Sequence, residues 1–380
     1  MTFNEIKDLL FGILHTTGIY NFQWNMMIMW GVGCLFIYLA IAKKHEPLLL
    51  LPIGFGIFIV NFPLVPLMGR SHGHAQLLQV FYHYGLEWEV IPCVIFLGLG
   101  AMTDFGPLIA NPKILLVGAG AQLGVFITFT GTILVGFTLK EAASVSIIGG
   151  ADGPTTIYLT QHLAPQLLGP NALAAYSYMA MVPLLQPPIM RLMTTPEERK
   201  IRMRQLRPVS KKEKIIFPLV TAGIIALLVP AVIPLMGMFM LGNLMKESGV
   251  VGRLTETAQG SLMNIVTIFL GLSVGATMHA DKFLSWKPLF IFGLGLLDFA
   301  VCTMGGIVTV KIMNMFLKEK INPLIGSAGV SAVPMASRVS QLEGMKYDKT
   351  NHLLMHAIGP NLAGVIGSAA AAGMFIAMFD

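Results

Sequence analysis

The sequence predicts an all-α polytopic membrane protein that contains an inverted repeat, two broken or re-entrant helices and the architecture of an elevator-type transporter. Three observations support this prediction. Hydrophobic residues make up 55% of the 380-residue chain and charged residues only 12%, with a mean hydropathy of +0.73, whereas soluble domains carry about twice that charged fraction. Several uncharged runs approach the roughly 20 residues that a membrane-spanning helix needs. Two apolar stretches, around Pro154 and Pro334, contain the glycine and proline that interrupt helices.

The first half of the chain divides into spans separated by polar or proline-rich breaks. We expect an N-terminal interfacial segment over 1–22, with a short amphipathic helix at 3–14. The N-terminal spans and an external loop occupy 23–84, and the first repeat occupies 85–190. The expected spans are 24–42, 47–63, 90–103, 113–138 and 169–190, with a broken stretch at 143–162.

The basic loop 191–214 sets the orientation of the chain. Nine of its 24 residues are Lys or Arg, and the positive-inside rule places such a loop in the cytoplasm. A nucleic-acid-binding patch is the rival interpretation, but the loop lacks interleaved aromatic residues and directly follows a predicted span. Connecting spans then occupy 215–258 and the second repeat 259–380. Here we expect two short proline-bent spans within 215–245, spans at 260–280, 288–310 and 353–378, and a broken stretch at 322–341.

The two halves share an order of short motifs. The matched positions are 96–99 with 269–272, Pro154 with Pro334, Gln161 with Gln341, and 169–171 with 359–361. If 191–214 and 246–259 are both cytoplasmic, the two repeats run through the membrane in opposite directions. Inverted repeats place a binding site near the midplane, where two discontinuous helices meet. The pattern therefore predicts a transporter.

The stretch 147–156 contains three glycines, a proline and Asp152 within an apolar region. An ionised Asp at the bilayer centre costs about 2.5–3.5 kcal/mol on insertion scales, so such residues usually face a pathway or an ion. One interpretation is a kinked helix whose Asp152 faces a surface loop. The other is a broken helix whose freed carbonyl groups, together with Asp152, form a cation site.

Three motifs resemble a signature of the membrane β subunits of sodium-pumping, biotin-dependent decarboxylases. They are GGADGPT at 149–155, NPLIGSAGVSAVP at 322–334 and GPNLAGVIGS at 359–368. The resemblance extends from about residue 25 to the C-terminus. The family includes oxaloacetate, methylmalonyl-CoA, glutaconyl-CoA and malonate systems, and the sequence does not indicate which acid this chain serves.

The resemblance implies a subunit of the bacterial cytoplasmic membrane that decarboxylates carboxybiotin, exports sodium and consumes a proton. The implied cofactors are Na⁺ and biotin carried on a separate subunit. The implied partners are the biotin carrier subunit, the carboxytransferase α subunit, a small membrane γ or δ subunit and membrane lipid, with a homo-oligomer left open and no nucleic acid. The alternative is a sodium-coupled secondary transporter of elevator type without its own chemistry. A purely structural anchor would give no reason for Asp152 and paired broken helices at membrane depth.

Residues implicated in the family map onto seven positions: Asp152, Tyr178, Asn322, Gly326, Ser331, Arg338 and Asn361. The resemblance implies catalytic roles for Asp152, Tyr178 and Arg338. It implies carboxybiotin binding by Arg338, Asn322 and Gly326. The implied sodium ligands are Asp152, Asn322, Ser331 and Asn361.

The chemistry of these residue types fits those roles. Sodium is a hard cation that takes oxygen ligands, which Asp, Asn and Ser side chains provide. Arg338 can hold a carboxylate through two parallel hydrogen bonds, although a cytoplasmic anchor beside a span is an alternative. Tyr178 can donate or relay a proton, and a packed aromatic residue is its alternative.

Overall fold

The computed structural model describes all residues except 1–11, 13–14, 19, 45, 66 and 72–73. Nearly all of the interfacial helix expected at 3–14 therefore lies outside the described residues. The regular secondary structure of the described residues is helical apart from strands β1 (Arg70–Ser71) and β2 (His74–Ala75), which pair in an antiparallel hairpin. This agrees with the predicted all-α class. The chain forms two compact units, residues 1–88 with 267–289 and residues 89–266 with 290–380.

The first unit is built on two apolar helices that approach closely. Besides the hairpin, it holds α2 (Trp24–Ala42), α3 (Pro47–Val60), α4 (Leu77–Phe81), the π-helical turn η1 (Tyr82–Glu87) and α16 (Ala280–Phe283). Gly33 and Gly54 face each other, and a Cβ on Gly33 would lie 2.8 Å from the Gly54 carbonyl oxygen. The buried Asn61 amide donates to the Ile57 and Met278 carbonyl oxygens at 2.8 and 2.9 Å, which ties α3 to the segment before α16.

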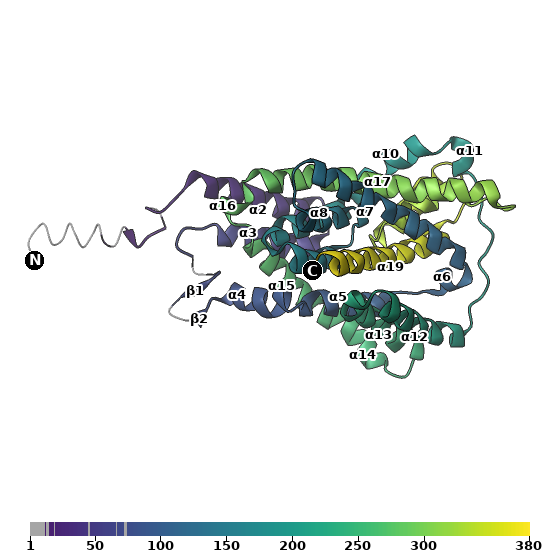
Figure 1. Ribbon diagram of the computed structural model, residues 1–380, viewed down its shortest axis with the longest axis horizontal. Coiled ribbons are helices and arrows are strands. Elements are labelled where there is room, and N and C mark those ends of the chain that lie inside the picture. Colours follow the sequence, from purple (N-terminus) through teal and green to yellow (C-terminus); the bar gives the residue numbers. More distant parts are fainter. Residues whose placement is uncertain (1–11, 13–14, 19, 45, 66, 72–73) are drawn as a thin grey trace, which may run out of the picture. The chain divides into compact units, whose positions relative to one another are not determined.

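The second unit holds most of the remaining helices, coloured from blue to yellow in Figure 1. Those in its first part are α5 (Val90–Met102), α6 (Gly106–Ala110), η2 (Pro112–Ile114), α7 (Leu115–Leu134), α8 (Leu139–Ser146), η3 (Ile147–Gly150), α9 (Gly153–Leu163), η4 (Pro165–Leu167), α10 (Leu168–Met193) and α11 (Pro196–Arg199). Those after the basic loop are α12 (Lys211–Leu228), η5 (Pro230–Val232), α13 (Ile233–Ser248), α14 (Gly252–Thr257), η6 (Ala258–Leu262), η7 (Pro323–Gly329), α18 (Met335–Met345) and α19 (Leu354–Phe379). Helices α15 (Met263–Ala276) and α17 (Trp286–Phe316) continue from one unit into the other.

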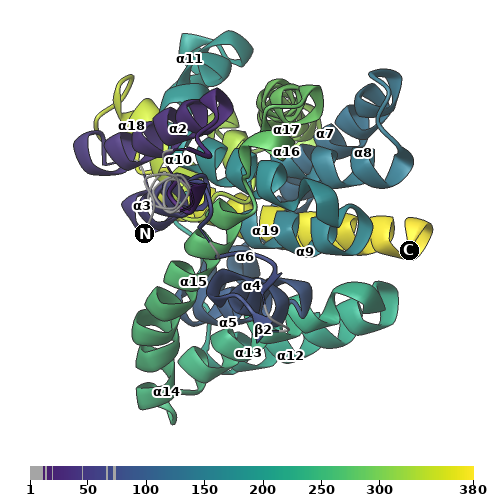
Figure 2. The ribbon, with the colours of Figure 1, turned by 90° about the vertical axis from the view of Figure 1, so that its left-hand side faces the viewer.

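Small residues allow the helices of the second unit to approach one another. Helices α5, α12 and α13 lie side by side in Figure 2. At the α5–α13 contact, a Cβ on Gly100 or Gly242 would overlap the backbone of the opposite helix. Helix α19 packs along α7 in the same way, because a Cβ on Gly118 would lie 2.5 Å from the Ala363 carbonyl carbon. Such contacts are typical of helices that associate in membranes.

Five helical segments of the described chain are long and apolar enough to cross a membrane, or six if 77–87 and 90–102 form one bent span. The five are Trp24–Ala42, Pro112–Leu134, Gly252–Ala276, Trp286–Phe316 and Leu354–Phe379. The sequence predicts ten spans, and the others are also helical but are shorter or less apolar. Helix α3, for example, has 14 residues, whereas α10 is a continuous helix of 26 residues that is less apolar than the five. A multi-pass membrane protein is therefore confirmed, with fewer full-length spans than expected.

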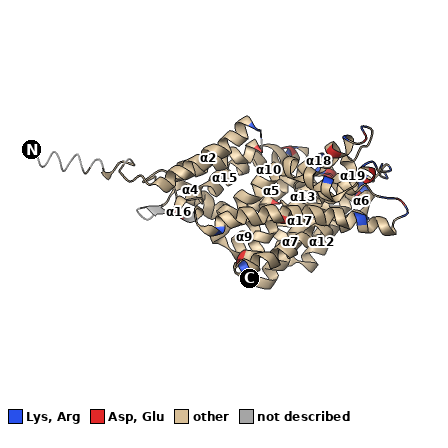
Figure 3. Ribbon diagram, turned by 90° about the horizontal axis from the view of Figure 1, so that it is seen from above, with Lys and Arg blue, Asp and Glu red and all other residues tan. Residues whose placement is uncertain are grey.

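Both predicted broken stretches are interrupted. The first passes from α8 into η3, reverses at Ala151, whose φ of +52° is left-handed, and resumes as α9 at Gly153. The second consists of η7, a non-helical segment of bends and turns at 330–334, and then α18. Proline in the first turn is compatible with helix initiation, and Pro154 is the second residue of α9. In Figure 3 charged residues gather around α6, α18 and the neighbouring loops, whereas the middles of the helices are uncharged apart from isolated acids.

Candidate functional site

Asp152 lies in the gap of the first broken stretch, at the N-cap of α9. Its Oδ1 accepts the backbone N–H of Thr155 at 3.2 Å, and its Oδ2 accepts the hydroxyl of Ser368 at 2.8 Å. The side chain is only 5% exposed. A carboxylate at a helix N-terminus is stabilised by the free N–H groups and the helix dipole. This placement supports the broken-helix interpretation of the sequence.

The two broken stretches meet beside Asp152. The backbone N–H of Ser331 donates to the carbonyl oxygen of Gly150 at 2.6 Å. The Ser331 hydroxyl donates to the Ser368 hydroxyl at 3.1 Å, which in turn donates to Asp152. Ser331 and Asp152 are thus linked through one bridging hydroxyl, and we call this arrangement the junction.

A small cavity of about 40 Å³ opens at the junction. Its lining includes Asp152, Ser331, Thr103 and Phe239. A cavity needs roughly 10–15 Å³ to hold one water molecule, so this space is large enough for a water or a small ion. Asp152 and Ser331 bring oxygen atoms to it, and oxygen is the ligand that hard cations prefer.

Asn361 supports the second broken stretch at the junction. Its amide nitrogen donates to the carbonyl oxygens of Val330 and Ala328 at 2.6 and 3.3 Å, immediately before Ser331. Gly326 lies in η7 against α17, where a Cβ would come within 2.5 Å of the Gly306 carbonyl oxygen. Both residues therefore fix the path of the backbone leading to Ser331.

Asn322 makes its hydrogen bonds with backbone groups of the basic loop and of η7. Its amide nitrogen donates to the carbonyl oxygens of Arg199 and Ile201 at 2.9 and 2.8 Å, and its oxygen accepts the N–H of Leu324 at 3.0 Å. The side chain is fully buried. Asn322 thus ties the basic loop to the start of the second broken stretch, and its hydrogen-bond partners among the described residues do not include Asp152.

Tyr178 is buried against α17. Its hydroxyl donates to the Phe292 carbonyl oxygen, and its ring leaves no room for a Cβ on Gly295. The tyrosine beside the Asp152 gap is Tyr176, whose ring lies where a Cβ on Gly153 would be. The Tyr176 hydroxyl is buried without a hydrogen-bond partner among the described residues. Residues two apart on a helix point in nearly opposite directions, which accounts for their different surroundings.

Arg338 is exposed on α18, where its guanidinium has no hydrogen bond or ion pair with any described residue. Several arginines of the basic loop are paired, with Arg202 bonded to Asp348, Arg204 to Glu319 and Arg207 to Glu213. Arg338 is therefore available to bind an external carboxylate. Its exposure is equally compatible with the alternative role of an arginine that anchors α18 at the membrane surface.

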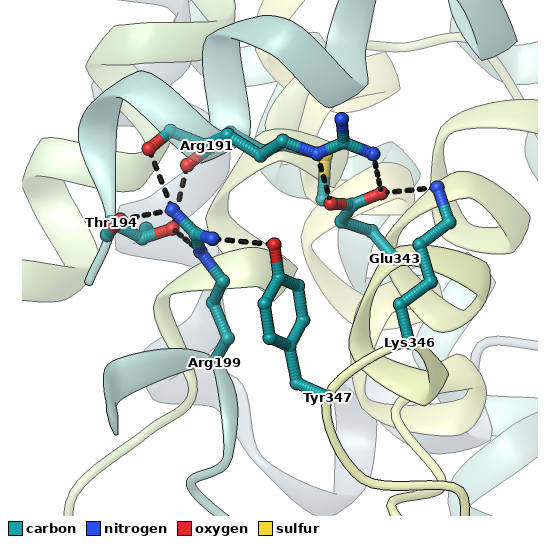
Figure 4. A network of polar contacts seen from close by, with 7 residues as sticks. Arg191, Thr194, Arg199, Glu343, Lys346 and Tyr347 are labelled. Carbon is teal, nitrogen blue, oxygen red and sulfur yellow. Dashed lines mark hydrogen bonds and ion pairs between the residues drawn. The ribbon is translucent and has the colours of Figure 1, made fainter. Parts of the chain in front are cut away.

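A polar network joins the end of α10 to α18, the helix that carries Arg338 (Figure 4). Glu343 is 1% exposed and accepts two hydrogen bonds from Arg191, at 2.6 and 3.1 Å, and one from Lys346 at 2.7 Å. Burial raises the pKa of Glu343, but the hydrogen bonds and charges of Arg191 and Lys346 outweigh it, so the pKa is lowered. Arg199 also bonds Tyr347 at 2.6 Å and lies over its ring.

Beside the basic loop is an open cavity of about 800 Å³. It is rich in positive charge and lies among the loop, the end of α17 and the segment before α7. Its basic lining residues are Lys113, Arg202, Arg204, Arg207, Lys318 and Lys320. A concentration of positive charge of this kind attracts acidic partners and raises their rate of association.

Four residues near the junction were not predicted from the sequence: Ser368, Tyr176, Gln122 and Asp298. Ser368 ends the third motif, so its position in that motif was a usable signal. Gln122 donates to the Gly364 carbonyl oxygen at 3.3 Å, while its own Oε1 is buried without a described partner, close to Gly150. Asp298 is the one acid in the 31-residue helix α17, which was also a visible signal.

Comparison with known proteins gives a consistent result. A family model described as "Na+-transporting oxaloacetate decarboxylase beta subunit" matches residues 25–379. The chain is 55% identical over 385 residues to methylmalonyl-CoA decarboxylase subunit beta of Propionigenium modestum, covering 96% of this chain and 98% of the relative. It is 54% identical over 369 residues to glutaconyl-CoA decarboxylase subunit beta of Acidaminococcus fermentans, covering 97% of each. It is 50% identical over 426 residues to oxaloacetate decarboxylase beta chain of Klebsiella pneumoniae, covering 97% of this chain and 98% of the relative.

Proposed function

The chain belongs to the family of Na⁺-transporting decarboxylase β subunits, and on this premise we propose that it decarboxylates carboxybiotin and exports sodium. The family is biotin-dependent, with biotin on a separate subunit. In the proposed reaction the bond between the carboxyl carbon and the biotin nitrogen breaks, CO₂ leaves, and the nitrogen takes up a proton. Moving one charge against about 100 mV costs roughly 2.3 kcal/mol, and decarboxylation supplies this energy. The alternative of a secondary transporter without chemistry is not favoured by the family.

We place the sodium site at the junction, and the hydrogen-bonded meeting of the two broken stretches beside Asp152 is the observation that carries this proposal. Asp152 supplies a negative charge, and Ser331 supplies a hydroxyl oxygen next to the small cavity. Asn361 and Asn322 are the other implied ligands, and both also hold the backbone of the second broken stretch through hydrogen bonds. The unpartnered Oε1 of Gln122, close to Gly150, is a further oxygen that a cation could satisfy.

Carboxybiotin would reach Arg338 from the side of the basic loop. Arg338 is exposed and unpaired, so its planar guanidinium can grip a carboxylate through two hydrogen bonds. Gly326 and Asn322 shape the second broken stretch behind it. The candidate proton donors are Tyr178, whose hydroxyl is hydrogen-bonded, and Tyr176, whose hydroxyl has no partner within the part of the chain that the structure describes. Asp152 is the proposed coupling residue, because it is the acid at the junction.

We also propose that the two broken stretches belong to an inverted repeat of elevator type. Each lies between two long helices, in the orders α7, α8–α9, α10 and α17, η7–α18, α19. The basic loop between the two sets supports opposite orientations in the membrane. The repeat boundaries at 85–190 and 259–380 belong to this same proposal.

The charged face around the 800 Å³ cavity is the proposed docking face for the biotin carrier subunit. The carboxytransferase α subunit and the small γ or δ subunit would complete the assembly in the bacterial cytoplasmic membrane, and association of several copies of this chain remains part of the proposal. Docking on this face would bring the biotin group to the end of the protein that carries the basic loop.

The deciding experiment measures whether sodium transport depends on the carboxylated biotin carrier. The purified protein is reconstituted into vesicles, and uptake of radioactive sodium is followed with carboxylated carrier, with uncarboxylated carrier, and with a solute gradient alone. We expect uptake only with carboxylated carrier, together with release of CO₂. Uptake driven by a solute gradient without any carrier would contradict the proposed function and favour the secondary transporter.

A further inference from the structure

Asp298 is a buried acid that the proposed reaction does not use. It lies near the middle of the 31-residue helix α17 and is 0% exposed. The other charged residues of α17 are Lys287 and Lys311, close to its two ends. An acid in the middle of an apolar span is expensive to insert and is by default a candidate functional residue whose partner should be identified.

The partner of Asp298 is the backbone of the first broken stretch. The N–H of Gly149 donates to Asp298 Oδ2 at 2.7 Å, and the Cys302 thiol lies 3.5 Å from Oδ1. A Cβ on Gly149 would overlap the carboxyl group itself. The contact therefore requires glycine at position 149, and at position 298 it requires a side chain long enough to bring an acceptor oxygen to the Gly149 N–H.

The same face of α17 holds the broken stretch at a second point. A Cβ on Gly295, one turn before Asp298, would lie 3.0 Å from the Ile148 side chain and 2.7 Å from the Tyr178 ring. Gly295 and Asp298 are three residues apart and so share a face of the helix. Together they fix Ile148 and Gly149 against α17 by close packing and one hydrogen bond.

This contact lies directly before the junction. The Gly150 carbonyl oxygen, one residue after Gly149, accepts the Ser331 N–H at 2.6 Å. Asp152 follows two residues later, after the left-handed turn at Ala151. Holding the Gly149 peptide in one orientation therefore constrains the direction of the Gly150 carbonyl group. It also constrains the position of the Asp152 backbone two residues later.

We propose that Asp298 is a positioning residue that holds the turn Ile147–Gly150 by accepting the Gly149 N–H, and so sets the affinity of the junction for sodium. Asp298 forms no ion pair with any described residue, so its role here is that of an acceptor. The inference rests on the proposed sodium site at the junction.

The test compares Asp298→Ala with Asp298→Asn in the complex with its carboxylated carrier. The sodium concentration for half-maximal decarboxylation and the maximal rate are measured for each. Loss of the hydrogen bond should raise that concentration about tenfold or more. Asp298→Asn keeps an acceptor oxygen and should stay within about threefold of the unchanged protein. The matched control is Thr303→Ala, a buried residue of α17 whose hydroxyl bonds only its own helix, and it should leave the concentration unchanged.

Two results would overturn the inference: an unchanged sodium requirement in Asp298→Ala, or an equal loss in Asp298→Asn and Asp298→Ala. A purely structural role would lower the yield or the maximal rate without moving the half-maximal concentration. Should Asp298→Ala fail to fold, Asp298→Leu fills a similar volume without an acceptor and replaces it in the comparison. Sodium dependence that persists in Asp152→Asn would refute the proposed site instead, so the two failures are distinguishable.

Discussion

The backbone N–H of Ser331 donates a hydrogen bond to the carbonyl oxygen of Gly150 at 2.6 Å, which joins the two broken stretches directly. Each stretch loses its helical hydrogen bonds at this point, so each supplies a group that the other can satisfy. Asp152 lies two residues beyond Gly150 and is connected back to Ser331 through Ser368. A change in the second stretch, which carries Ser331, is therefore transmitted to the carboxylate of Asp152 in the first.

Replacing Asp152 by Asn should abolish sodium-dependent turnover, because it removes the formal negative charge of the junction while keeping the size of the side chain. Decarboxylation measured against sodium concentration checks this. Asp281→Asn is the matched control, since Asp281 is 67% exposed and lies in α16; it should leave the sodium dependence unchanged. Normal sodium dependence in Asp152→Asn would place the ion elsewhere.

Ser368→Ala should raise the sodium concentration needed for half-maximal turnover by about tenfold, because a hydrogen bond to a charged group is worth roughly 1.5–3 kcal/mol. The lost bond is the one to Asp152 Oδ2. Ser331→Ala should also raise this concentration, because it removes the hydroxyl oxygen that we propose as a sodium ligand beside the cavity. An unchanged sodium requirement in Ser331→Ala would mean that Ser331 is not a ligand.

Arg338→Lys should lose most decarboxylation, because a point charge does not reproduce the planar fork of the guanidinium. Carboxybiotin should accumulate on the carrier, whose carboxylation does not need this subunit, and the carboxylated fraction can be measured directly. Arg253→Lys is the control, because Arg253 is likewise exposed without a described partner. Normal decarboxylation with failed sodium transport would assign Arg338 to the ion path.

Glu343→Gln should destabilise the protein at neutral pH by about 1–2 kcal/mol, because Arg191 and Lys346 lose a charged acceptor. The pKa of Glu343 is lowered in the folded protein, so its stabilisation is fully present above the ordinary Glu pKa of about 4.3. It is lost as the pH falls through the lowered value. Thermal unfolding of both proteins in detergent from neutral to acidic pH should show the difference shrink at low pH; a constant difference would exclude this ion pair as its cause.

Gly326→Ala should destabilise the protein by about 1–3 kcal/mol, since the new methyl group would come within 2.5 Å of the Gly306 carbonyl oxygen. Gly131→Ala in α7 is the control, because a Cβ there meets nothing within 4 Å and should be neutral or mildly stabilising. Unfolding temperature and activity are measured for both variants. Equal behaviour of the two would show that the second broken stretch adapts to the added volume.

The breaks could be predicted because they are encoded locally. Glycine and proline weaken a helix locally, and both stretches, where several of them cluster, are interrupted in the structure. A lone proline is a weaker signal, since α19 continues through Pro360. The partners of Asn322 could not be predicted, since an amide in a motif is equally suited to an ion or to the carbonyl oxygens of Arg199 and Ile201. Only the folded path of the basic loop decides between them.

The two tyrosines of α10 illustrate a second limit on what the sequence can predict. Helical spacing shows that Tyr176 and Tyr178 face different directions, but which of them lies beside the Asp152 gap depends on how α9 and α17 pack. Asp298 is conspicuous in the sequence as an acid in an apolar span, whereas its contact with Gly149 joins residues far apart in the chain. Local pattern thus identifies such residues without identifying their partners.

The backbones of Gly306 and Gly326 touch with no side chain between them. Interlocking side chains must separate before one element can shift along another, and that separation opens empty volume. Two bare backbones have no such interlock, so a shift of η7 along α17 would not have to separate side chains at this contact. If the proposed elevator motion moves η7 along α17, this pair of glycines would offer it no side-chain obstacle.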